Sequence, residues 1–146
     1  MTIKFLGHPV HMLLVHFPAA LFPMDLVCSV LDFFFHKRLF ADASLCAVTG
    51  GALTGWIALF FGLLDLLAIP EQKSRERLWG FIHGSLNGSA VFVFTLLAYL
   101  SVYNFPLPYG HPVLLIAIKA VTVCMLMVGN YFGGNLVLKY KIGVEE

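Results

Sequence analysis

The chain has 146 residues and a formal net charge of +1, with 60% hydrophobic and only 12% charged residues. Its mean hydropathy is +0.88, and its share of charged residues is about half that of an average soluble domain. So few charges could not cover the surface of a small domain in water, which excludes a water-soluble monomer. The near-neutral charge offers no basic face for nucleic acid. We expect one compact membrane domain over residues 1–146.

Four apolar runs are each long enough to cross a lipid bilayer, whose hydrocarbon layer of about 30 Å takes about 20 helical residues. They cover Pro9 to Phe35, Ala41 to Ile69, Glu76 to Tyr103 and Pro112 to Leu138. Short charged or turn-forming segments separate them. Because short loops join antiparallel neighbours, we predict an all-α integral membrane four-helix bundle with up-down-up-down topology. The first run has no convincing cleavage site, so we expect no signal peptide to be removed.

The basic residues predict the orientation. An even number of spans places both termini on one side of the membrane. That side collects Lys4, Lys73, Arg75, Arg77, Lys139 and Lys141, whereas Lys37 and Arg38 lie on the other. The positive-inside rule then predicts that both termini are cytoplasmic.

Small residues recur within the apolar runs. Glycines stand four residues apart at Gly51 and Gly55, at Gly80, Gly84 and Gly88, and at Gly129 and Gly133. Such glycine faces either allow helices to pack closely or leave room for a planar cofactor. The three cysteines, Cys28, Cys46 and Cys124, are too widely spaced for a metal or redox motif, and we expect them to be small buried hydrophobes.

An ionisable side chain within a span costs about 3 kcal/mol or more, so each one needs an explanation. Asp25 and Lys119 lie at similar depth when residues are counted from the cytoplasmic ends of their helices at about 1.5 Å per residue. We predict an ion pair between them that fixes the register of the first and fourth helices. The alternative is that Lys119 extends to the far interface while Asp25 is protonated.

Most other polar residues of the spans lie toward the cytoplasmic side. They are His8, His11, His16, Asp65, Trp79, His83, Asn87, Asn130 and Asn135. His16 and His83 lie at similar depth, roughly 10 Å from their helix ends. Trp79, His83 and Asn87 share one stripe of a helix because they are four residues apart.

The histidine side chains of the first run point to different sides of the helix. At about 100° per residue, His8 and His11 are about 60° apart, whereas His11 and His16 are about 140° apart, so a straight helix cannot point all three at one ion. Two neutral imidazoles from facing helices, next to glycine faces, are what axial ligation of haem iron in a bundle requires. We therefore expect His16 and His83 to face each other across the interior.

Several strings together resemble a known family. They are the opening Gly7-His8-Pro9-Val10-His11 with His16-Phe17-Pro18, then Gly62-Leu63-Leu64-Asp65, His83-Gly84-Ser85-Leu86-Asn87 and Gly133-Gly134-Asn135. The chain is similar over nearly its whole length to the bacterial predicted-membrane-protein family catalogued as uncharacterised domain family 2231. The resemblance implies a four-span protein of a bacterial inner membrane whose characteristic polar residues match His8, His11, His16, Asp65, His83, Asn87 and Asn135. It implies no function.

Our leading hypothesis is a protein that binds haem b and transfers electrons near a respiratory chain, with a quinone or a redox protein as partner. His16 and His83 would be the axial ligands, Asn87 and Asp65 would be the partners that hold an imidazole N–H, and Trp79 and Gly84 would line the macrocycle. With both axial positions filled, the protein is an electron carrier rather than an enzyme.

Two alternatives stay open. In the first, His8 and His11 bind a non-haem transition-metal ion with Asp65 or His83, and a transport role would require a homo-oligomer. In the second, the protein is a structural assembly subunit without a cofactor, and its histidines and asparagines only satisfy helix ends.

Overall fold

The computed structural model describes residues 4–5, 8–105 and 111–142. These form the two-residue strands β1 (Lys4–Phe5) and β2 (His8–Pro9) and the helices α1 (Val10–Leu14), α2 (His16–Phe35), α3 (Arg38–Leu67), α4 (Ser74–Asn104) and α5 (Pro112–Leu138). Four helical segments, with α1 and α2 taken as one, are long and apolar enough to cross a membrane. The predicted all-α four-helix architecture is confirmed, with segment ends shifted by up to three residues. The antiparallel pairing of β1 with β2 was not predicted.

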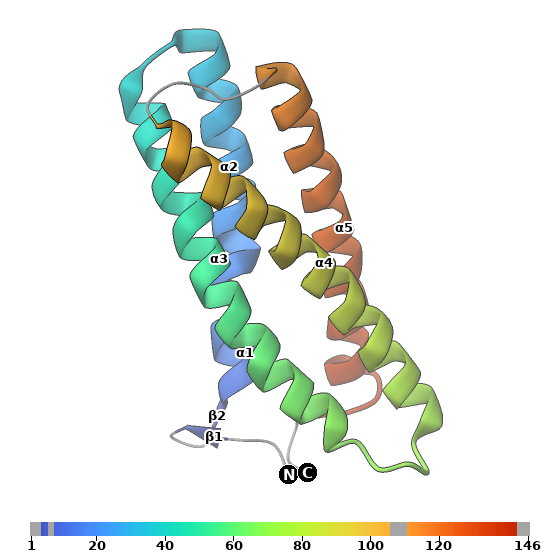
Figure 1. Cartoon of the computed structure of the whole chain (residues 1–146). Helices are drawn as coiled ribbons and strands as arrows, with labels where there is room; N and C mark the ends of the chain where they lie inside the picture. Colours follow the sequence, from blue (N-terminus) through green and yellow to red (C-terminus); the bar gives the residue numbers. More distant parts are fainter. Residues whose placement is uncertain (1–3, 6–7, 106–110, 143–146) are drawn as a thin grey trace.

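The long helices alternate in direction and form a ring (Figure 1). α2 packs on α3, α3 on α4 and α4 on α5, while α5 returns to α2 and α1 lies against α3. We call the end with β1, β2 and the α3–α4 connection the strand end. The end with the α2–α3 connection and the start of α5 is the opposite end.

A proline explains the break between α1 and α2. Pro18 has no N–H to donate, and its ring conflicts with the carbonyl group four residues earlier, which belongs to Leu14. Accordingly α1 ends at Leu14, and Val15 is a turn residue before α2 begins. Pro23 is accommodated inside α2. The interruption therefore falls between His11 and His16.

The apolar core lies at mid-height, where aromatic side chains meet a glycine face. Phe22 and Phe94 are fully buried and stack with ring centroids 4.1 Å apart. Gly51 of α3 lies so close to Phe22 that an added Cβ would come within 2.7 Å of its ring. The glycine face of α3 at this height therefore accommodates helix packing rather than a cofactor.

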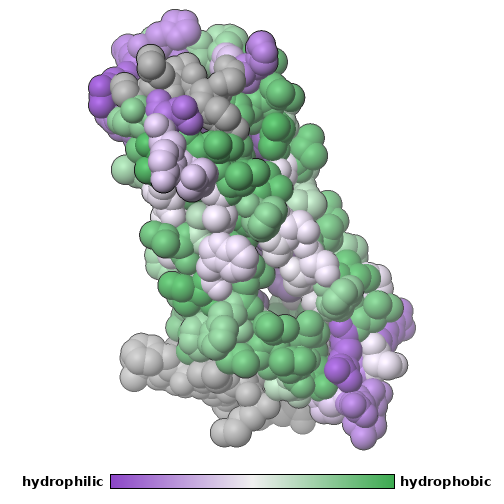
Figure 2. All heavy atoms as spheres, in the orientation of Figure 1, coloured by the Kyte–Doolittle hydropathy of each residue, from purple (hydrophilic) through white to green (hydrophobic). Residues whose placement is uncertain are grey.

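Large apolar side chains cover the outside of the bundle. Leu53 and Val121 are each 70% exposed, and Figure 2 shows hydrophobic residues along the bundle with hydrophilic ones gathered toward its two ends. Such a surface suits hydrocarbon rather than water.

The expectation that all three cysteines are buried is wrong, because Cys46 and Cys124 are exposed and only Cys28 is buried. Helices that are apolar all round do not reveal which face is buried.

Asp25 of α2 and Lys119 of α5 contact each other inside the bundle. Lys119 Nζ lies 2.7 Å from Asp25 Oδ1, and the two residues are 6% and 0% exposed, respectively. Lys119 also donates to Ser29 Oγ at 2.7 Å, and Ser44 Oγ of α3 donates to the same carboxylate oxygen. The cluster therefore connects three helices and closes the ring between α2 and α5.

Removing one member of this pair should destabilise the protein. We expect Lys119→Met to lower the free energy of unfolding by about 3–5 kcal/mol, because the Asp25 carboxylate stays buried without its partner. The double variant Asp25→Leu, Lys119→Met should recover much of that loss. Unfolding in detergent measures both, and equal losses in the single and double variants would contradict the interpretation.

Candidate cofactor site between two histidines

A cavity of about 330 Å³ lies between the helices in the half of the bundle nearer the strand end. All five helices contribute to its wall, with His11 of α1, Pro18 of α2, Leu59 of α3, His83 of α4 and Leu126 of α5 among the lining residues. Its volume lies within the range of about 300–1,000 Å³ typical of small-molecule sites. Most of the lining is apolar, and a few polar side chains point into it.

The cavity reaches the outer surface between α3 and α4. Leu63 of α3 and Phe81 of α4 line the cavity, yet they are 55% and 62% exposed. The two helices diverge toward the strand end (Figure 1), and the surface is hollowed between them (Figure 2). A ligand could therefore enter laterally from the lipid.

His11 is held in place by α3. Its Nδ1 lies 2.9 Å from the carbonyl oxygen of Ala58. Its ring rests on Gly62, one turn further along α3, where an added Cβ would come within 2.7 Å of His11 Cε1. Because only a glycine leaves this space, the ring position depends on Gly62.

His83 is held by α5 in a similar way. Its Nδ1 lies 2.7 Å from the carbonyl oxygen of Gly129, and a Cβ at Gly133 would come within 2.6 Å of His83 Cε1. Asn87, one turn along α4, rests on Gly129 in turn and donates from Nδ2 to the backbone oxygen of His83 at 3.0 Å. The glycine face of α5 thus accommodates an imidazole and an amide.

These hydrogen bonds fix the tautomer of both histidines. A carbonyl oxygen only accepts hydrogen bonds, so the Nδ1 atom of each ring must carry the proton. The 3.0 Å approach of Asn87 Nδ2 to His83 Nδ1 is then a contact between two donors rather than a hydrogen bond. In each neutral ring Nε2 has a free lone pair.

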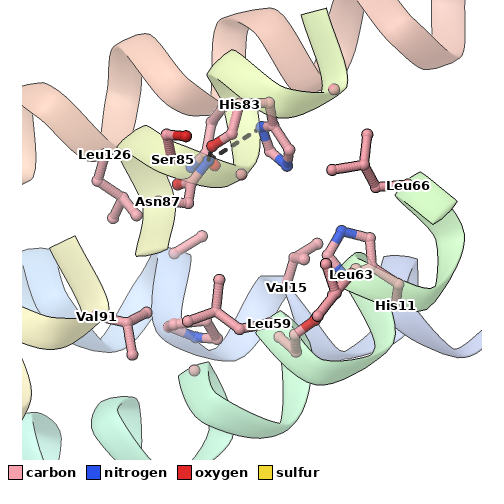
Figure 3. Close-up of a pocket in the computed structure, with 18 of the residues that line it drawn as sticks. His11, Val15, Leu59, Leu63, Leu66, His83, Ser85, Asn87, Val91 and Leu126 are labelled. Carbon is pink, nitrogen blue, oxygen red and sulfur yellow. Dashed lines mark hydrogen bonds between the residues drawn. The ribbon is translucent and has the colours of Figure 1, made fainter. Parts of the chain in front are cut away.

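The two rings face each other across the cavity (Figure 3). Their centroids are 6.3 Å apart and their planes are inclined by 80°. When both rings are neutral, the two Nε2 atoms cannot hydrogen-bond to each other and are available to a shared partner such as a metal ion or a donor group. Asn87 Oδ1 is a further buried acceptor that has no hydrogen-bond partner in the described part of the chain.

The structure brings His11, rather than the expected His16, to His83. His16 is exposed and does not line the cavity. The angle of about 140° between residues five apart turns His16 away when His11 faces inward, and the break at Val15 does not reverse this. Equal depth along two helices was therefore an insufficient criterion for the pair.

The other predicted residues have mixed positions. Gly84 and Asn87 line the cavity, whereas Trp79 does not and instead stacks on Phe132 with ring centroids 5.1 Å apart. Asp65 is half-buried in the last turn of α3. His8 lies in β2, and its side chain is outside the described structure. Over the described ranges, no three His, Cys, Asp or Glu residues come together as ligands for a metal ion.

Sequence reasoning missed the groups that hold the imidazoles. Gly62 belongs to a string that carries the family resemblance, but it lies outside the four-residue glycine repeats and so gives no sign of a contact with His11. Ala58 acts through its backbone oxygen, which the residue type does not reveal. Gly129 and Gly133 do give a signal in the sequence, because two glycines four residues apart form a helix face that another group can approach closely.

Two neighbouring glycines of α5 provide a test of this arrangement. Gly133→Ala should lower the free energy of unfolding by about 1–3 kcal/mol, because its methyl group collides with the His83 ring. Gly134→Ala is the matched control, since nothing lies within 4 Å of its added Cβ, and it should be neutral or stabilise the helix by about 1 kcal/mol. Thermal unfolding in detergent compares them, and equal behaviour would contradict the proposed role of Gly133.

Comparisons with known proteins give one match. Neither a curated protein nor a solved structure matches the chain. A family model described as "Predicted membrane protein (DUF2231)" matches residues 7–146. This range includes all helices of the bundle and both facing histidines. The chain therefore belongs to the DUF2231 family of predicted membrane proteins.

Proposed function

We propose that the protein binds haem between His11 and His83 and carries electrons within the membrane. The observation that supports this best is the pair of facing imidazoles, each with its Nδ1 proton held by a backbone carbonyl. Histidines that ligate metals commonly donate their second ring N–H to such a carbonyl, which fixes the ring and increases its basicity. His11 replaces His16 in this proposal because of its position in the cavity.

The number of ligands favours haem over a bare metal ion. A structural zinc site needs four protein ligands and a catalytic one needs three, whereas haem iron receives four nitrogens from its macrocycle and needs two axial ligands at most. With metal–imidazole bonds of about 2 Å, one ion between the two rings agrees with the 6.3 Å centroid separation.

The surroundings of the histidines fit a flat apolar group. Gly84, next to His83, lines the cavity, and nothing lies within 4 Å of a Cβ added there. The opening between Leu63 and Phe81 allows the edge of a macrocycle to extend beyond the cavity toward the lipid. Asn87 braces His83 from behind through the backbone hydrogen bond.

The bound haem would supply one-electron exchange, with its potential adjusted by the two imidazoles and the apolar lining. His11 and His83 would both hold the iron and would leave no place on it for a substrate, so we propose an electron carrier rather than an enzyme. The lateral opening suits exchange with a membrane-soluble quinone. The excess of Lys and Arg on the side of the two termini supports a bacterial inner membrane with both termini cytoplasmic. The site would then lie near the cytoplasmic face.

Histidine variants test the proposal directly. The protein purified after expression with ample haem should show a Soret band and sharp visible bands on reduction with dithionite. His11→Ala and His83→Ala should each reduce haem content by about ten-fold or more. Losing even a residue that hydrogen-bonds to a metal ligand typically lowers metal affinity by that much. His16→Ala is the matched control and should keep the wild-type spectrum.

Three results would oppose the proposal. The wild-type protein could lack a Soret band, His16→Ala could abolish the band, or zinc or copper could be present in place of iron. Stable His11→Ala and His83→Ala variants whose cofactor and metal content equals that of the wild type would favour the assembly-subunit alternative.

A second test fills the cavity without touching a ligand. Gly84→Leu should exclude haem while the protein stays folded, because the side chain projects into open space beside His83. Gly134→Leu is the control in α5, where space is also open but the residue does not line the cavity. The ratio of Soret to protein absorbance measures occupancy, and equal occupancy in the two variants would contradict the proposed position of the macrocycle.

A further inference from the structure

A second cavity, of about 230 Å³, lies toward the opposite end of the bundle and reaches the buried ion pair. Lys119, Ser29 and Ser44 form part of its wall, and its other hydroxyl-bearing or titratable lining residues are Asp32, His36 and Ser101. It shares no lining residue with the histidine cavity. The two cavities are therefore separate sites.

One face of α2 carries polar residues from the ion pair to the end of the helix. Asp25, Ser29 and Asp32 are spaced by four and three residues, which places them on the same side of α2, and His36 follows directly after the helix. The last three line the second cavity. Polar stripes of this kind are expensive in lipid and are found where they meet water or an ion pathway.

The ion pair itself has an unused acceptor. Asp25 Oδ1 accepts hydrogen bonds from Lys119 and Ser44, while Oδ2 is buried and finds no partner among residues 4–5, 8–105 and 111–142. An unsatisfied carboxylate oxygen is costly, and buried water is its usual partner. The cavity of 230 Å³, whose lining includes polar groups among apolar ones, has room for several waters at about 30 Å³ each.

We infer that this cavity is a water-filled vestibule through which protons reach the Asp25–Lys119 pair from the opposite end only. Asp25 itself does not line the cavity, so water there meets the pair at Lys119, Ser29 and Ser44. A proton delivered to the Ser44 hydroxyl, which donates to Asp25 Oδ1, passes to the carboxylate and leaves by the same route, so no other reactant is needed. The path stops at the pair, because the fully buried Phe22 and Phe94 occupy the bundle between it and the histidine cavity. The inference does not depend on haem.

The polar and titratable side chains that line the second cavity agree with its role as a water-filled vestibule. The cavity is lined by Ser29 and Asp32 of α2, by His36 directly after that helix and by Lys119 of α5. Helices α3 and α4 contribute only the hydroxyls of Ser44 and Ser101 as polar side chains. Arg38 and Asp42 form a pair at the start of α3 that is well exposed to solvent, with side chains 66% and 50% exposed.

Cysteine labelling in lipid vesicles tests whether the vestibule holds water. Ser44→Cys and Ser101→Cys are made in a background with Cys28, Cys46 and Cys124 replaced by alanine. Thiols react as thiolates, which form in water and not in hydrocarbon, so a membrane-impermeant methanethiosulfonate should label both variants about ten-fold or more faster than wild-type protein. Wild-type Cys46 is a matched control, two residues from Ser44 but exposed on the outer surface.

Ser101→Cys leaves the hydrogen bonds of Asp25 intact, so it remains informative if Ser44→Cys fails to fold. Labelling of both variants at the wild-type rate would show that the cavity is dry and would overturn the inference. Proton passage has its own measurement, which is hydrogen–deuterium exchange of the Lys119 ammonium group by NMR. Exchange should be fast in wild-type protein and slower in Ser101→Phe, which fills the vestibule. No exchange in wild-type protein would overturn the proton path even if labelling succeeds.

Discussion

The candidate site depends on one property of the peptide backbone, which is that a carbonyl oxygen accepts hydrogen bonds and never donates them. The carbonyls of Ala58 and Gly129 each receive an imidazole N–H, and this forces the protons of His11 and His83 onto Nδ1. Both Nε2 lone pairs then remain free and face one cavity. The same constraint orients the rings in the way that the proposed haem site requires.

Glycine makes this constraint possible, because a ring can approach a helix backbone closely only where no Cβ intervenes. Gly62 and Gly133 provide that approach for the two histidines, and Gly129 does the same for Asn87. Other glycines of the bundle have a different role, as Gly51 shows where it meets Phe22 in the core. These glycines thus admit histidine and asparagine side chains at one height of the bundle and an aromatic ring at another.

Much of the fold could be predicted from the sequence, because apolar length and turn residues define spans almost directly. The Asp25–Lys119 contact could also be anticipated, since two ionisable residues at equal depth in lipid strongly favour each other. The choice between His11 and His16 could not be made in this way. It depends on the rotation of α1 about its axis, which apolar residues on every face leave undetermined.

The two polar regions of the bundle have different surroundings. The histidine cavity is largely apolar and opens laterally between α3 and α4, which suits a flat ligand with little charge. The region around Lys119 lies toward the opposite end and is rich in hydroxyl groups, which suits water. The packed aromatic core of Phe22 and Phe94 separates them. The proposed haem site near one end and the proposed proton-accessible pair near the other are therefore structurally independent features of one small bundle.

The central claim is that His11 and His83, in the orientation set by α3 and α5, are the two axial ligands of haem iron. Electron paramagnetic resonance of the oxidised, haem-loaded protein tests it most directly, because the signal reports the angle between the axial imidazole planes. The 80° inclination of the rings predicts the highly anisotropic low-spin signal of nearly perpendicular imidazoles. A high-spin signal, or the rhombic low-spin signal of parallel imidazoles, would contradict the account.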